Sequence, residues 1–248
     1  MRHLLIFSLF LASYLFGHFA YAQNQGARVL VEGFNNTSTK YDGRVVRGSV
    51  GYAIPETVDI EIGVDDLSRT YPGDVQIKDT TFSADAVSRI NKSFYLENFY
   101  SKSTTADIYS IWTTKMGLHY TGNHGDIGLT AKYDEFKKSI AGSLIPSYFY
   151  SFSDEVGLGA AVFAVRTDTT SFALQLQALY KIFNRHSFRL VGAGGQAIED
   201  AGLIADFRSV TTRYVYDVND HWQVGATLVD YWSTVRNEKS IGISLGYR

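Results

Sequence analysis

The sequence predicts an all-β protein: a single antiparallel transmembrane β-barrel of about 14 strands, with about 12 as the alternative count. Three observations lead to this prediction. The chain opens with a basic and then apolar segment, turn-forming residues recur at a regular spacing, and the apolar residues between the turns alternate with small or polar ones. Together these features are typical of a chain that is exported and then crosses a membrane with strands.

The first 22 residues have the features of a secretory signal peptide. Arg2 and His3 precede an apolar run over residues 4–19, and Ala20-Tyr21-Ala22 supplies an A-x-A cleavage site. The run is shorter than the roughly 20 apolar residues that a transmembrane helix needs. We therefore expect residues 1–22 to be removed and residues 23–248 to form one barrel domain. The absence of Cys excludes a lipoprotein anchor and a disulfide framework.

The composition is compatible with a barrel. The formal net charge is -2, which gives no indication of a nucleic-acid partner. The mean hydropathy of -0.08 is low for a helical membrane protein. A barrel is expected to have such a value, because only every second residue of each strand contacts lipid.

Turn-forming residues divide the rest of the chain at regular intervals. One set of short clusters lies at residues 54–57, 89–93, 121–125, 153–155, 184–187 and 217–220. A second, more variable set lies between them, at residues 35–43, 70–78, 101–105, 136–142, 166–170, 196–202 and 236–239. These breaks leave about 14 segments of roughly ten residues, with short turns at one end of the barrel and longer loops at the other.

Within most segments the apolar residues have a period of two, as in a strand with two different faces. One face of residues 58–65 carries Val58, Ile60, Ile62 and Val64, and the other carries Asp59, Glu61, Gly63 and Asp65. Residues 172–182 alternate in the same way. The pattern is less regular where Glu32 interrupts residues 29–34 and at residues 94–99. It is also less regular where Asp206 and Arg208 share a face with Val210, which predicts a bulge or an early exit from lipid.

The last nine residues form the most regular segment, and we expect them to close the barrel. Apolar Ile241, Ile243, Leu245 and Tyr247 alternate with small residues. The spacing of Ser240, Gly242, Leu245 and Tyr247 resembles the C-terminal signal that the barrel-assembly machinery recognises in bacterial outer-membrane proteins. The chain departs from that pattern by ending on Arg248 rather than on the aromatic residue.

The signal peptide, the hairpin spacing and the final stretch over residues 208–247 resemble the YaiO-like family of outer-membrane β-barrel proteins. The resemblance covers most of the mature chain and is carried by pattern rather than by a diagnostic motif. It implies a barrel in the bacterial outer membrane, which in some relatives is linked to the export of a surface polysaccharide. It supplies no catalytic residues.

The sequence gives no support for an enzyme, a cofactor site or a metal site. The mature chain has four histidines, His119, His124, His186 and His221, and all lie at or beside the short turns, where we interpret them as polar turn residues. The glycines of residues 157–159 and 192–195 precede no helix and no Lys-Ser/Thr pair, so they do not form a phosphate loop. No cluster has the spacing of metal ligands.

The inner face of the barrel is the remaining candidate for function. The pore-lining candidates are Asp59, Glu61, Asp85, Glu97, Lys115, Lys132, Gln175 and Gln177. The charged members lie on the third to seventh strands, whereas the later strands present mainly small or neutral residues. Glu61, Glu97 and Lys132 are expected near mid-height, and the largest loop is expected near residues 65–80. The charges either line a water-filled lumen or pair with neighbours in a closed barrel.

The leading functional hypothesis is a passive outer-membrane pore for small hydrophilic solutes. The alternative is a structural or accessory barrel in surface polysaccharide export, and a more distant one is a secreted soluble β-sandwich that binds a ligand. The expected partners are outer-membrane lipid and lipopolysaccharide, the barrel-assembly machinery and, in the second hypothesis, surface-glycan export components.

Overall fold

The computed structural model describes residues 26–137, 139–183, 185–199 and 203–248. The predicted signal peptide lies outside these ranges. The described residues form strands of 10 to 15 residues, several of them longer than the sequence predicts. The strands are β1 (Gly26–Ser38), β2 (Asp42–Ile54), β3 (Val58–Tyr71), β4 (Val75–Arg89), β5 (Phe94–Ser103), β6 (Trp112–Gly122), β7 (Gly125–Glu135), β8 (Ile140–Ser151), β9 (Val156–Arg166), β10 (Thr170–Ile182), β11 (His186–Glu199), β12 (Leu203–Asp217), β13 (Trp222–Ser233) and β14 (Asn237–Tyr247).

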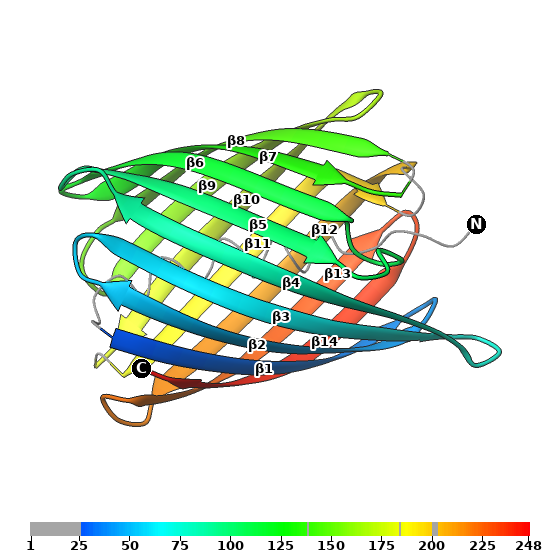
Figure 1. The fold of residues 1–248 in the computed structure, drawn as a ribbon, viewed down its shortest axis with the longest axis horizontal. Helices are drawn as coiled ribbons and strands as arrows, with labels where there is room; N and C mark the ends of the chain where they lie inside the picture. The colour runs from blue at the N-terminus through cyan, green and yellow to red at the C-terminus, as the bar shows by residue number, and fades with distance from the viewer. Residues whose placement is uncertain (1–25, 138, 184, 200–202) are drawn as a thin grey trace.

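The strands form one closed barrel in which each strand pairs antiparallel with its neighbours in sequence, as Figure 1 shows. The last strand closes the barrel against the first, with Tyr247 opposite Val29 and Ser240 opposite Asn36. The prediction of an all-β barrel with 14 strands is therefore confirmed, and the alternatives of 12 strands and of a two-sheet sandwich are wrong. No helix in the described residues has the length and hydropathy that a membrane-spanning helix requires.

The two ends of the barrel differ. At the end that we call the turn end, short connections follow β2, β4, β6, β8, β10 and β12, and β14 finishes there. At the opposite end, the loop end, the β3–β4 hairpin extends past its neighbours (Figure 1), and it turns tightly over residues 72–74. The longest connection in the described part of the chain is the β5–β6 loop, residues 104–111. The prediction of a large loop near residues 65–80 is therefore wrong, because most of those residues extend β3 and β4.

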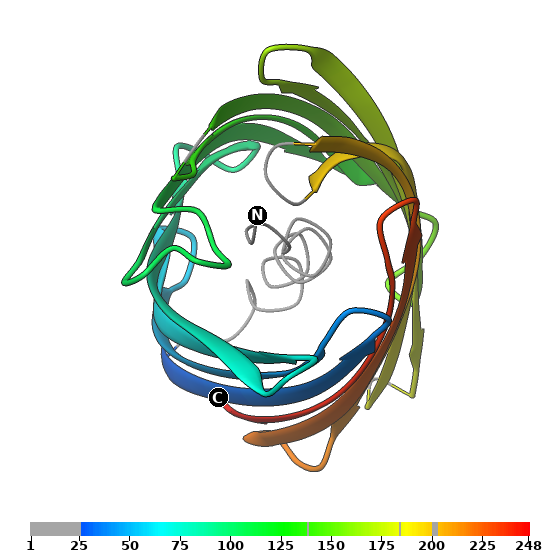
Figure 2. The same cartoon turned by 90° about the vertical axis from the view of Figure 1, so that its right-hand side faces the viewer.

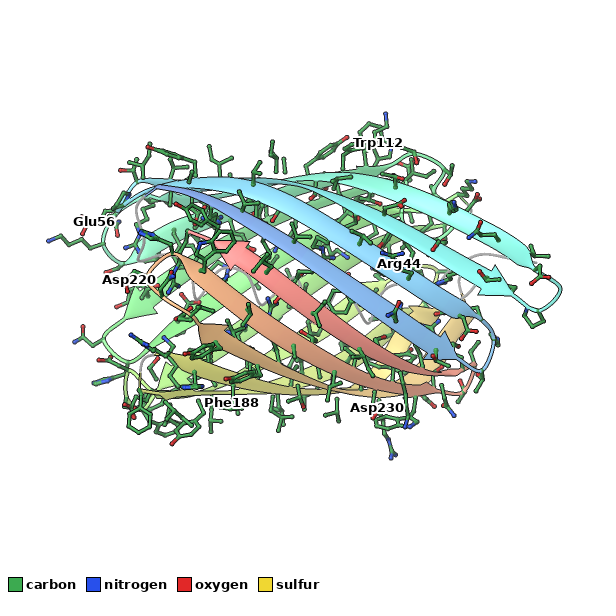
Figure 3. The ribbon with its side chains drawn as sticks, turned by 90° about the horizontal axis from the view of Figure 1, so that it is seen from below. Arg44, Glu56, Trp112, Phe188, Asp220 and Asp230 are labelled. Atoms are coloured by element: carbon green, nitrogen blue, oxygen red, sulfur yellow. The ribbon has the colours of Figure 1, made fainter. Side chains whose placement is uncertain are left out.

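The alternation of apolar and polar residues separates an outer face from an inner face. Large apolar side chains are exposed on the outside of every strand, whereas many polar and charged side chains are buried on the inside. Figure 3 shows Phe188 and Trp112 on the outside, with Glu56 and Asp220 at the turn end. This arrangement fits a barrel whose outer face meets lipid, because an apolar surface of this extent is costly in water.

Two irregular segments of the sequence are regular in the structure. Glu32 points inward, as Asn36 does, whereas Val29 and Val31 lie on the outer face. In β12 the pairing with β11 and β13 continues without a break through Arg208 and Val210, so the predicted bulge is absent there. Asp206 and Arg208 lie on the exposed outer face, and Arg208 is opposite Trp232. The early exit from lipid stays a prediction.

Candidate functional site: the barrel lumen

All eight predicted pore-lining residues lie on the inner face of their strands. Glu97, Lys115 and Gln175 are buried there, and the other five share the inward-facing positions of their strands. Counted from the turn end, Glu97 is the fourth of the ten residues of β5, near mid-height as expected. Glu61 is the fourth of 14 in β3 and Lys132 the eighth of 11 in β7, so these two lie nearer the turn end and the loop end, respectively. The structure joins Glu97 and Lys115 in one ion pair, whereas Asp59, Glu61 and Lys132 pair with residues outside the candidate set.

The first ion-pair group joins β1 to β3 near the turn end. The Nη1 atom of Arg28 donates to Oδ2 of Asp59 at 2.8 Å, and its Nε atom donates to Oε2 of Glu61 at 3.2 Å. The intervening strand carries Gly51, where a Cβ atom would lie 2.8 Å from the centre of the guanidinium group. The absence of a side chain at Gly51 therefore gives Arg28 room to reach across β2 to both carboxylates.

A second group forms a row of alternating charges along β12, β1, β2 and β3. Arg213 donates to Glu32 at 2.9 Å, although β13 and β14 lie between their strands. Glu32 also lies 3.6 Å from Arg47, which donates to Asp65 at 2.6 Å. Arg213 is not among the residues predicted from the sequence, because a bulge in β12 would leave its face undetermined.

A third group surrounds His119 on the inner face of β5, β6 and β7. The Nδ1 atom of His119 lies 3.0 Å from Asp126, and its ring stacks on Tyr95 with the centroids 4.6 Å apart. The Nε2 atom lies 3.5 Å from Glu97, which also pairs with Lys115. The interpretation of His119 as a turn residue is therefore wrong, because the side chain is part of the buried lumen. The inward position of Asp126 could have been predicted, because its neighbour Ile127 faces outward and successive residues of a strand point to opposite faces.

The other three histidines lie at the turn end. His124 is in the β6–β7 turn, His186 contacts the hydroxyl of Tyr214 at 2.9 Å, and His221 contacts the last backbone carbonyl. These positions agree with their interpretation as polar residues beside the turns. Among the described residues, no group of three or more His, Cys, Asp or Glu side chains is arranged to hold a metal ion.

At the loop end, Asp79 holds the β5–β6 loop against the inside of the barrel wall. Asp79 is 1% exposed, and its carboxylate accepts hydrogen bonds from the backbone N–H groups of Ala106, Ile108 and Tyr109, at 3.3, 3.2 and 3.0 Å. The hydroxyl of Thr105 donates to the same carboxylate at 3.0 Å. Ala106 has a φ of 52°, a left-handed conformation that a non-glycine residue adopts only when its surroundings impose it.

The loop also packs through its apolar side chains. Ile108 and Tyr109 form a buried cluster with Phe34, Val45 and Leu67 from β1, β2 and β3. Burial raises the pKa of the Tyr109 hydroxyl, so this group stays protonated and neutral. In Figure 2, which looks along the barrel axis, one part of this loop projects inward from the rim of the barrel. A loop in this position can narrow the opening.

The other half of the loop end has a second apolar cluster on the inner face. Phe163 and Val165 of β9 pack with Ile145 of β8, and the rings of Phe207 and Tyr231 stack at 5.8 Å. The later strands are therefore less uniformly small and neutral than the sequence predicts. They carry this apolar cluster near the loop end and inward-facing arginines nearer the turn end.

The predicted assembly residues lie on both faces of β14. Ser240 and Gly242 point inward, and a Cβ atom at Gly242 would lie 2.2 Å from the ring of Phe34. Leu245 and Tyr247 point outward, and Tyr247 packs against the edge of Trp222 at 5.0 Å. The faces agree with the expected pattern. The role of these residues in recognition by an assembly machinery stays a prediction.

Comparisons with known proteins identify the fold and no family. No protein-family model matches the chain, and no curated protein sequence is significantly similar to it. The resemblance to the YaiO-like family therefore stays a prediction.

Similar solved structures include Omp33, an outer-membrane protein of Acinetobacter baumannii, with a TM-score of 0.55 and 10% identity over 91% of this chain and 100% of that one. The toluene transporter TodX of Pseudomonas putida has a TM-score of 0.54 and 9% identity over 90% and 89% of the two chains. The translocator domain of the autotransporter NalP of Neisseria meningitidis has a TM-score of 0.53 and 10% identity over 97% and 93%. These likenesses establish the porin-like fold of outer-membrane β-barrels, a fold that serves proteins of different function.

Proposed function

We propose that this chain is a passive pore for small hydrophilic solutes in the bacterial outer membrane. The observation that carries the proposal is the contrast between the two faces of one closed barrel. The outer face is apolar along the strands, and the inner face carries charged and amide side chains from one end towards the other. A polar inner face stabilises water and polar solutes inside the barrel, whereas a barrel with a purely structural role could be filled with apolar side chains.

In this proposal the chain is exported through a signal peptide and inserted by the barrel-assembly machinery through its last strand. Its outer face contacts membrane lipid, with lipopolysaccharide at the loop end. Part of the β5–β6 loop is held on the inner face at the loop end, and the paired charges make the lumen nearly neutral. Such a lumen discriminates weakly between cations and anions, because selectivity follows from rings of one charge sign.

The test is conductance of the purified, folded protein in a planar lipid bilayer. A passive pore gives discrete current steps that scale with voltage, and its reversal potential under a salt gradient lies close to zero. The same protein after heat unfolding serves as the control and should give no steps. If well-folded protein carries no current, the pore proposal is wrong.

The extensive pairing of the lumen charges favours one other candidate, a structural or accessory barrel. Charges such as Glu97 and Lys115, which satisfy one another inside the wall, are also expected in a barrel that transports nothing. In that case the protein would act beside surface-glycan export components. A folded barrel without conductance, encoded next to glycan-synthesis genes, would support this second candidate.

A further inference from the structure

The inner face of β8, β9 and β10 is almost uncharged. In β8 and β9, both of which are described in full, no Asp, Glu, Lys or Arg occupies an inward-facing position. On β10 the inward-facing charge is Lys181, the second residue from the turn end. Each strand from β1 to β7, by contrast, has at least one inward-facing charged residue. A solute beside β8–β10 therefore meets hydrogen-bonding and apolar groups rather than ions.

Three uncharged polar side chains lie together on this part of the wall. Ser147 of β8 and Gln175 of β10 are both opposite Ala161 of β9, and Gln177 of β10 is opposite Gly159. All three alternate with outward-facing apolar residues and so point into the barrel. We call Ser147, Gln175 and Gln177 the neutral patch. Ser147 and Gln177 are partly exposed, so a solute in the lumen can reach them.

The absence of a side chain at Gly159 brings groups from β8 and β10 together over β9. A Cβ atom at Gly159 would lie 2.6 Å from Nε2 of Gln177 and 2.9 Å from the ring of Phe149. The two side chains therefore lean over β9 from opposite sides. Because the ring of Phe149 also covers Gly157, it occupies the wall beside the amide and restricts the positions that the amide of Gln177 can take.

Two buried polar atoms on this wall have no hydrogen-bond partner in the described part of the chain. They are Oε1 of Gln177 and Oγ of Ser143, which lies two inward positions from Ser147 towards the loop end. Ser143 is 7% exposed. Buried polar atoms are nearly always hydrogen-bonded, because an unmade bond leaves the loss of hydration uncompensated. The carbonyl oxygen of an amide only accepts hydrogen bonds, so the group that fits Oε1 of Gln177 is a donor.

We propose that the neutral patch makes the pore favour uncharged, hydroxyl-rich solutes, namely sugars and sugar alcohols. A hydroxyl group can donate to the amide oxygen of Gln177 and accept from an amide N–H group or from the hydroxyl of Ser147. An ion beside an uncharged wall loses hydration and gains no opposite charge in return. The inference rests on the proposed pore and specifies its substrate class.

The experiment measures how a solute lowers the ion current through the protein in a planar bilayer. Maltose, an uncharged disaccharide, is compared with a polyethylene glycol of similar mass, whose ether oxygens accept hydrogen bonds but cannot donate them. Maltose should lower the current to a plateau as its concentration rises, because a binding site saturates. The glycol should lower the current without a plateau, in proportion to the conductivity of the solution. Equal effects of the two solutes would overturn the inference.

Substitution of one glutamine tests whether the neutral patch is the site. Gln177→Leu removes the amide and keeps a side chain of similar size. The maltose concentration that gives half of the current reduction should rise about twofold to tenfold, as expected for the loss of one hydrogen bond. A folded Gln177→Leu pore that responds to maltose as the wild type does contradicts the inference.

Gln223→Leu is the matched control. Gln223 of β13 also leans over a glycine of the neighbouring strand, because a Cβ atom at Gly246 would lie 2.5 Å from its Nε2 atom, but it lies outside the neutral patch. Its substitution should leave the response to maltose unchanged, and an equal shift in both variants would refute the assignment of the site. If current flows and maltose has no saturating effect, only this inference fails. If well-folded protein carries no current, the proposed pore fails with it.

Discussion

On β14 the apolar side chains are exposed on the outer face, and polar ones such as Ser240 are buried on the inner face, which is the reverse of their arrangement in a soluble protein. Ile243 is 72% exposed on the outer face, whereas Ser240 is 2% exposed on the inner face. In water the apolar side chain would be buried and the hydroxyl exposed. The difference indicates that the outer face is adapted to lipid and the inner face to polar neighbours. The two faces should therefore respond in opposite ways to the same kind of substitution.

The largest effect is expected for a charge on the outer face. Tyr247→Asp places a carboxylate where Tyr247 packs against Trp222 at 5.0 Å. Contact of this carboxylate with lipid lowers the stability by up to about 2 kcal/mol, depending on the depth of the residue in the bilayer. Loss of the contact between the two aromatic rings lowers it by roughly 1 kcal/mol more. Because the substitution also removes the aromatic residue of the predicted assembly signal, we expect little folded protein in the membrane fraction. The measurement is heat-dependent gel mobility of that fraction.

Tyr247→Phe is the matched control for this variant, because it keeps the ring and should accumulate normally. Folded Tyr247→Asp protein at the level of the control would refute the role that we assign to the last strand.

An intermediate effect on the amount of folded protein, but a larger loss of thermodynamic stability, is expected when one charge of a buried inner pair is removed, because the predicted assembly signal stays intact. Glu97→Gln leaves the ammonium group of Lys115 and the ring of His119 without the shared carboxylate. Breaking a buried ion pair typically costs about 3–5 kcal/mol, because the remaining charge is left in a medium of low dielectric constant. Unfolding by urea in detergent micelles should therefore have a lower midpoint.

Glu97→Gln combined with Lys115→Met removes both charges of this pair and should recover much of the lost stability. If the double variant is as unstable as the single one, the loss arises from packing rather than from the isolated charge.

The smallest effect on stability, and the most specific effect on current, is expected at the loop end. Asp79→Asn keeps the shape of the side chain but removes the charge that accepts the backbone N–H groups of the β5–β6 loop. Hydrogen bonds to a charged group are worth roughly 1.5–3 kcal/mol each, so the loop should leave the lumen more often. We expect a larger and noisier single-channel current than in the wild type.

The control lies in the same loop. Asp107 pairs with Lys137 at 2.7 Å on the exposed side, and such surface pairs contribute about 0–1 kcal/mol. Asp107→Asn should leave the current unchanged. Equal currents in Asp79→Asn and wild type would mean that the loop does not narrow the conducting path.

The sequence by itself determined the strands, their number and the face of most residues. These properties are local: a turn-forming cluster ends a strand, and a period of two assigns each side chain to a face. For this reason the inward positions of Asp59, Glu97 and Gln175 could be predicted from their own segments. Where the local pattern was irregular, as at Glu32 and Arg208, pairing with the neighbouring strands decided the face.

Only the tertiary structure decided which inner residues meet. Arg213 and Glu32 are far apart in sequence and are brought within 2.9 Å because the barrel closes between β14 and β1. The hydrogen bonds from the β5–β6 loop to Asp79 leave no periodic pattern in the sequence. The carboxylate accepts them from backbone N–H groups, which every residue except proline carries. The position of Lys181 on the strand opposite that of Asp59 likewise follows from strand number and closure, because β10 is seven strands from β3 in either direction.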